Sequence, residues 1–159
     1  MWTRVATTVE TVRSRNTLRE FIYLPRVLYS GDPLWSPPLW LEERQTFSDK
    51  NPLLAHSDYE LFLARVDGRA VGRLLAYDDH NFNEYNHSKI GMFGSFESIR
   101  DLEVAANLFT EAENWLTLRG MVTVRGPINP VEECWGSLYR GFGRPATFMM
   151  PYNPPYYNE

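Results

Sequence analysis

The sequence predicts an α+β domain built on a mixed α/β sheet with helices on its faces. An Asp67-Gly68 pair joins two strand-like segments, and a long amphipathic helix pattern covers residues 102–119. A short apolar strand pattern follows that helix at 121–124. An antiparallel meander followed by a strand–helix–strand crossover gives a sheet with both antiparallel and parallel pairs.

The first third of the chain predicts one strand and two helices. Residues 5–13 are rich in β-branched side chains, which favour a strand. Ser14 or Asn16 is a suitable cap for the helix that follows. Pro25 lacks a backbone donor and predicts a kink or break in that helix. A second short helix is expected at 39–47, because prolines are tolerated in a first turn.

The central third predicts three strands. Segments 59–66 and 69–77 form a hairpin, because a type I′ turn needs positive φ at both central positions and Asp-Gly satisfies this. Residues 78–87 are dominated by polar side chains and predict a surface loop. Residues 88–98 predict another strand, in which Gly91 and Gly94 permit a bulge or a close backbone approach.

The strongest helix pattern lies in the last third. Asp101 is a good N-cap and Gly120 a good C-terminal stop. The expected buried stripe consists of Ala105, Leu108, Phe109, Ala112, Trp115 and Leu116. We expect a single domain over 1–159, with a core at about 5–128 and an irregular Pro/Tyr-rich tail at 129–159.

Composition argues against several classes of function. The net charge is −4, and no basic cluster suggests nucleic-acid binding. Cys134 is the only cysteine and the three histidines lack helical metal-ligand spacing, so no metal site is expected. No signal peptide and no apolar run of about 20 residues is present. We therefore expect a cytoplasmic protein without a membrane partner.

Several blocks carry a family resemblance from about residue 18 onward. They are Phe21-Ile22-Tyr23-Leu24-Pro25, Asp32-Pro33-Leu34-Trp35-Ser36-Pro37-Pro38-Leu39, Phe62-Leu63-Ala64-Arg65 with Asp67-Gly68-Arg69, Val71-Gly72-Arg73, Gly126-Pro127-Ile128-Asn129, Gly141-Phe142, and the segment from Met149 to Tyr157. Together they resemble the N-terminal part of an uncharacterised bacterial family of GNAT-like acyltransferases. The resemblance implies a β-α-α-β-β-β-α-β core that lacks the C-terminal elements of a complete GNAT domain.

The resemblance also implies a cofactor site beside the 88–98 strand. Acetyl-CoA or another acyl-CoA would pair its pantetheine arm with that strand and place its pyrophosphate at the start of the next helix. The residues implied are Phe93, Gly94, Ser95, Phe96 and Arg100. The family's glycine-rich phosphate loop is missing, and Glu97, Asp101 and Glu103 bring three carboxylates to that junction.

Catalytic candidates are fewer, and each has a structural alternative. Tyr152 and Tyr156, with Tyr157 beside them, resemble the tyrosine that GNAT enzymes use as a general acid, or they pack as an ordered aromatic segment. Glu132, next to Glu133, is a candidate general base, or an ordinary solvated side chain.

Other polar side chains also leave alternatives open. Asn129 lines a pocket or forms an Asx turn. Arg65, Arg69 and Arg73 alternate along the hairpin, where two of them share a face as an anion-attracting patch or a solvated one.

Two functional hypotheses follow from these observations. One is an acyl-CoA-dependent N-acyltransferase acting on a small-molecule amine. The other is a non-catalytic binding or dimerisation module, with a homodimer formed through the edge of the 121–124 strand or the aromatic tail. The chain could also be a segment of a longer protein that completes the sheet.

Overall fold

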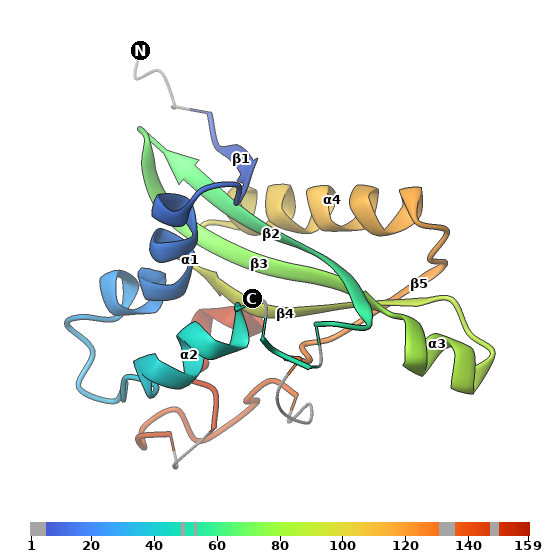
Figure 1. The fold of residues 1–159 in the computed structure, drawn as a ribbon. Coiled ribbons are helices and arrows are strands. Elements are labelled where there is room, and N and C mark those ends of the chain that lie inside the picture. The colour runs from blue at the N-terminus through green and yellow to red at the C-terminus, as the bar shows by residue number, and fades with distance from the viewer. Residues whose placement is uncertain (1–5, 49, 53, 131–135, 147–149) are drawn as a thin grey trace.

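The computed structural model describes residues 6–48, 50–52, 54–130, 136–146 and 150–159. A five-stranded sheet in the order β1-β2-β3-β4-β5 has α1 and α2 on one face and α4 on the other (Figure 1). The strands are β1 Thr8–Thr11, β2 Ser57–Val66, β3 Arg69–Asp79, β4 Ile90–Ser98 and β5 Thr123–Arg125. The helices are α1 Arg15–Leu28, α2 Trp40–Thr46, α3 His80–Asn86 and α4 Leu102–Leu118, followed by the 3₁₀ turn η1 Pro155–Asn158.

The sheet is mixed, which confirms the predicted fold class. Strands β1 to β4 pair antiparallel, whereas β4 and β5 pair parallel across the α4 crossover. The predicted hairpin is also confirmed, because Asp67 and Gly68 have φ of 50° and 73° between β2 and β3.

Helix α1 begins where the sequence predicts and runs through the expected interruption. Ser14 caps it through a reciprocal pair of bonds with Thr17. The helix is not split at Pro25, so the expected break is wrong, whereas the kink stays a prediction. Proline cannot donate to the carbonyl of Phe21, and Arg73 of β3 donates to that oxygen instead, at 2.9 Å. A tertiary contact therefore satisfies the group that proline leaves unpaired.

The predicted loop at 78–87 is wrong. Its first two residues complete β3, and the next seven form α3. The Asp79 carboxylate accepts the N–H of Phe82 at 2.9 Å, and His87 ends the helix in the left-handed conformation. Asn83 also donates to Asp78 and to the Ile90 carbonyl. These caps and side-chain bonds hold a short polar helix that has no buried residues.

Helix α4 follows the prediction, whereas β5 departs from it. Asp101 caps α4, and the buried residues are Val104, Leu108, Ala112 and Leu116, of which Val104 was not expected. Strand β5 starts two residues later than predicted, and all three of its residues are exposed. An outer strand has a neighbour on one side only, which explains the exposure.

Candidate active site

Strand β4 contains an irregularity that shapes the candidate site. Its register with β3 shifts opposite Arg73 and Leu75, and Ser95 has a positive φ of 48°. Phe93 and Phe96, three residues apart, both pack on Phe109 of α4, with ring centroids 5.0 and 5.1 Å away. Residues three apart in a regular strand face opposite sides, so the bulge adds the one residue that places both rings on the same face.

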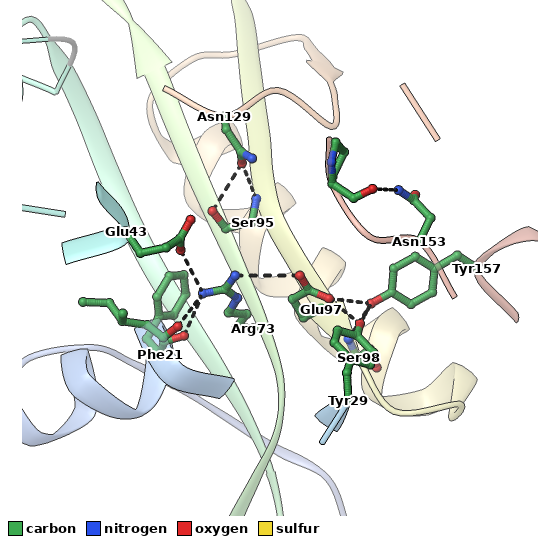
Figure 2. Close-up of polar contacts among 12 residues, drawn as sticks. Phe21, Tyr29, Glu43, Arg73, Ser95, Glu97, Ser98, Asn129, Asn153 and Tyr157 are labelled. Atoms are coloured by element: carbon green, nitrogen blue, oxygen red, sulfur yellow. Dashed lines mark hydrogen bonds and ion pairs between the residues drawn. The ribbon is translucent and has the colours of Figure 1, made fainter. Parts of the chain in front are cut away.

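Beside this bulge, the segment that follows β5 continues along β4. The parallel ladder pairs residues from Ile90 to Met92 with β5, and the Ile128 N–H then donates to Phe93 O at 2.8 Å. Further along, the Asn129 side-chain oxygen accepts the Ser95 N–H at 2.7 Å and the Ser95 hydroxyl at 3.2 Å (Figure 2). Two donors of Ser95 thus converge on one carbonyl-type oxygen. The Asn129 side chain therefore bonds across to β4, and its position in a pocket stays a prediction.

Gly94 is required by this close approach. A Cβ at this position would lie 2.3 Å from the Ile128 carbonyl oxygen and 2.5 Å from the Asn129 oxygen. Any side chain there would push the segment after β5 away from β4. The sequence-based expectation of a close backbone approach at this glycine is confirmed.

The C-terminal segment covers the end of the same strand edge. The Tyr156 hydroxyl donates to Ser98 O at 2.6 Å, and the Ser98 N–H donates to the Tyr157 hydroxyl at 2.9 Å. Tyr152 lies slightly apart, where its hydroxyl donates to Asp32 and its ring packs against Tyr29 at 4.9 Å. Tyr156 and Tyr157 therefore pack against the end of β4, whereas Tyr152 contacts Asp32 and Tyr29, and their role as proton donors stays a prediction.

A buried polar cluster lies on the α1/α2 face of β4. Glu97 accepts hydrogen bonds from Tyr29 and Tyr157, whose hydroxyl oxygens are 2.9 Å apart (Figure 2). Arg73 lies 3.7 Å from the Glu97 carboxylate and 3.8 Å from that of Glu43. The Glu97 and Arg73 side chains are only 15% and 5% exposed. The placement of Glu97 at the phosphate junction is therefore wrong, because the bulge turns its side chain to the opposite face.

Burial sets the protonation of this cluster. It raises the pKa of Glu97, although the nearby Arg73 guanidinium opposes that shift. Burial also raises the pKa of Tyr29 and of Tyr157, and the Glu97 carboxylate reinforces both shifts. The two phenols stay protonated at neutral pH, and the carboxylate is a stronger proton acceptor than an exposed glutamate. A base and two hydroxyl donors thus lie beside the Ser95 bulge.

The junction between β4 and α4 carries two of the three expected carboxylates, Asp101 and Glu103, but not Glu97. An open cavity of about 540 Å³ at the start of α4 is lined by Arg100, Asp101, Leu102, Glu103 and Ala106. Arg100 pairs with Glu159 at 2.7 Å, and the Asp101 carboxylate accepts the Glu103 N–H at 2.9 Å. An incoming phosphate would compete with both carboxylates.

The structure does not test the general-base candidate Glu132 or its neighbour Glu133, because both lie outside the described residues. The single cysteine, Cys134, lies outside them as well. Within the described ranges, no group of three or more His, Cys, Asp or Glu side chains could hold a metal ion. In the same part of the chain, no helix is both long and apolar enough to span a bilayer.

Tyr29, Arg73 and Glu97 form a cluster that the sequence interpretation did not identify. The spacing of Phe93 and Phe96 was the available signal, since two aromatics three apart in a strand suggest an inserted residue. That insertion reverses the face on which Glu97 lies. The Tyr29 and Tyr157 contacts span 68 and 60 residues, and no local pattern indicates them.

One solved structure matches the arrangement of the sheet and helices. It is an aminoglycoside acetyltransferase from an uncultured soil metagenomic sample, solved in complex with sisomicin, with a TM-score of 0.53 and 17% sequence identity over 77% of each chain. The fold is therefore GNAT-like. At this identity the similarity concerns the GNAT-like fold alone.

Two curated proteins are similar in sequence. Protein YghO of Escherichia coli K12 is 37% identical over 150 residues, and the bacterial ceramide synthase of Caulobacter vibrioides is 36% identical over 148 residues. The matches cover 94% and 91% of this chain but only 38% of each relative. The chain thus corresponds to well under half the length of these relatives. No family model matches the chain.

Proposed function

We propose that this chain forms the GNAT-like part of an acyl-CoA-dependent N-acyltransferase whose acceptor is a long-chain amine. The observation that carries the proposal is the convergence of the Ser95 N–H and hydroxyl on one carbonyl-type oxygen beside buried Glu97. The similarity to a ceramide synthase suggests the acceptor class, because a ceramide is the amide of a long-chain amino alcohol.

Ser95 would act on the acyl carbonyl. A bound acyl-CoA would supply an activated thioester, whose carbonyl oxygen would replace the Asn129 oxygen between the two Ser95 donors. Donors already oriented toward a carbonyl oxygen stabilise the negative charge that develops there during acyl transfer. Phe93, Gly94 and Phe96 would line the strand edge beside the acyl-pantetheine arm.

Glu97 would accept a proton during the reaction, and one of the tyrosines would donate one. Glu97 would accept a proton from the attacking amine, because burial makes its carboxylate more basic than an exposed one. As the C–N bond forms and the C–S bond breaks, Tyr156 would donate a proton to the departing thiolate, with Tyr152 as the second candidate. Burial raises the pKa of both phenols and keeps them protonated. Arg100 would bind phosphate once released from Glu159.

Titration calorimetry of the purified chain with acetyl-CoA and with long-chain acyl-CoAs tests the cofactor. We expect a long-chain acyl-CoA to bind and Gly94→Val to abolish binding, because its side chain would fill the strand edge. Gly143→Val, where nothing lies within 4 Å of a Cβ, is the matched control. Absence of heat and of thermal stabilisation with every acyl-CoA would contradict the proposal.

Mass spectrometry of amide formation from a long-chain amine tests the chemistry. In Glu97→Gln, turnover should fall by roughly 10² to 10⁴, the usual contribution of a general base. Glu113→Gln, which alters an exposed carboxylate on α4, should leave turnover unchanged. An unaltered rate in Glu97→Gln would remove Glu97 from the reaction.

A non-catalytic binding or homodimerisation module is the second candidate. The hydrogen bonds of Tyr156 and Tyr157 to both backbone groups of Ser98 favour it, because side chains already occupy that part of the edge. Exposed Val122 and Val124 at the β5 edge offer a surface for a second copy. Light scattering at micromolar concentration distinguishes a dimer from a monomer, and a monomer that binds acyl-CoA would exclude this candidate.

A further inference from the structure

A second open groove lies away from the β4 edge, between α1 and the β2–β3 hairpin. Its volume is about 810 Å³, and four arginines line it: Arg19 and Arg26 from α1, and Arg65 and Arg69 from the hairpin. Among the described residues that line it, Glu20 is the only carboxylate. The groove is therefore strongly basic in a chain whose net charge is −4.

Among the described residues, three of the four arginines have no counterion. Arg65 is held by Glu10 and Glu20, each 2.6 Å away. In the part of the chain that the structure describes, Arg19, Arg26 and Arg69 make no side-chain hydrogen bond or ion pair, and all three are exposed. Folding thus gathers three uncompensated cations from two elements that are distant in sequence.

The spacing on α1 places these cations together. Residues 19, 23 and 26 follow one another at intervals of four and three, so that they share one side of the helix. Tyr23 lies between the two arginines, and Val27 at the groove is 69% exposed. Leu24 and Ala70 add further apolar lining. The groove therefore combines separate cations with apolar surface.

We propose that this groove docks the protein on a membrane surface containing anionic phospholipid, with lipid phosphates bound by Arg19, Arg26 and Arg69. Guanidinium groups pair with phosphate oxygens through two parallel hydrogen bonds. Tyr23 and Val27 suit the headgroup region, where amphipathic rings and small apolar side chains lie between water and lipid. Unlike a single dissolved phosphate, a bilayer presents several phosphates and an apolar layer together, which matches an open groove with spaced cations.

This docking site is independent of acyl transfer and is compatible with the absence of a membrane-spanning helix in the described residues. The expectation of no membrane partner rested on the lack of an apolar run of about 20 residues, which concerns spanning a bilayer and not binding to its surface. The fold brings Arg19, Arg26 and Arg69 to one groove, and docking there would also bring the protein to the membrane, where a long-chain amine resides.

Vesicle co-sedimentation tests the proposal. Wild-type protein is mixed with phosphatidylcholine vesicles and with vesicles that also contain about 30% phosphatidylglycerol, at low salt and at about 0.5 M salt. We expect binding to the anionic vesicles only, with loss at high salt. The variant Arg19→Gln/Arg26→Gln/Arg69→Gln should lose on the order of 100-fold in partitioning, since each arginine near such a surface contributes roughly fivefold.

A matched control removes the same charge elsewhere. Arg125→Gln/Arg140→Gln/Arg144→Gln alters three exposed arginines outside the groove and should partition within about threefold of wild type, an effect of net charge alone. Circular dichroism confirms that both variants fold. The proposal is overturned by equal losses in the two variants or by no binding to anionic vesicles. Release of bound wild type by inorganic phosphate, but not by chloride of equal ionic strength, would assign the groove to a dissolved anion and also overturn it.

Discussion

The two faces of the sheet are built differently. The face toward α4 buries an apolar cluster that includes Phe62, Leu74 and Leu108. The face toward α1 and α2 buries a comparable apolar cluster but also encloses Arg73 and Glu97. Burying charged groups costs free energy unless they are paired and hydrogen-bonded. Stability alone therefore does not explain why the face toward α1 and α2, here called the polar face, buries these two side chains. Such clusters are typical of functional sites, and this one adjoins the Ser95 bulge.

Arg73 is the residue on which the polar face depends most. Arg73→Met keeps the length of the side chain but leaves Glu97 and the Phe21 carbonyl without their cationic partner. We expect a loss of about 4 kcal/mol in the free energy of unfolding, because removing one member of a buried pair strands the other. Urea denaturation measures this loss.

Two further variants test why Arg73→Met loses stability. Arg69→Met at the exposed start of β3 should cost less than about 0.5 kcal/mol. Pro25→Ala restores a backbone donor for Phe21 O, so Arg73→Met should cost about 1 kcal/mol less in that background. A small loss in Arg73→Met itself would show that the polar face contributes little to folding.

Leu108 tests the apolar face. Leu108→Ala should cost about 3 kcal/mol, because this fully buried side chain leaves a cavity between α4 and the sheet. Leu118→Ala, on the exposed end of α4, should cost less than about 0.5 kcal/mol. Similar chemical-denaturation midpoints for the two variants would contradict the assignment of Leu108 to the core.

Tyr157 tests the contact between the C-terminal segment and β4. Tyr157→Phe removes the hydroxyl that bonds Glu97 and accepts the Ser98 N–H, and should cost about 1–2 kcal/mol. Tyr139→Phe, an exposed tyrosine, is the matched control and should be neutral within about 0.5 kcal/mol. Thermal unfolding of both variants suffices, and an equal Tm would place residue 157 away from β4 in solution.

The pH dependence is the smallest expected effect, since only a proton changes. The pKa of Glu97 is higher in the folded protein than in the unfolded chain, so the folded state binds more protons in the window above the ordinary value of about 4.3. The contribution of Glu97 to stability should therefore fall as the pH rises through that window toward the raised pKa.

Glu97→Gln lacks this titration. The stability of wild type relative to Glu97→Gln should decrease from about pH 4 upward and level off above the raised pKa. Denaturation curves at several pH values measure that difference. A difference that increases with pH would mean that Arg73 outweighs burial and lowers the pKa of Glu97.

Short-range signals determined much of the architecture. The Asp67-Gly68 turn, the Ser14 and Asp101 caps and the Gly120 stop each act over a few residues, so they can be identified from the sequence. The strand-like and helical patterns also predicted the element order and hence a mixed sheet. The loop predicted at 78–87 failed because capping and Asn83 side-chain bonds stabilise a helix there without an apolar stripe.

By itself, the sequence determined the order of the five strands and of helices α1, α2 and α4, the hairpin, the main helix caps and the strand that carries the candidate site. Only the tertiary structure decided that α1 continues through Pro25, that Glu97 faces Arg73 and Tyr29, and that the last tyrosines cover β4. The physical reason is the distance along the chain over which each interaction acts. Turns and caps depend on backbone geometry within a few residues, whereas a one-residue bulge reverses the faces of a strand and contacts across 50 or more residues depend on packing of the whole chain.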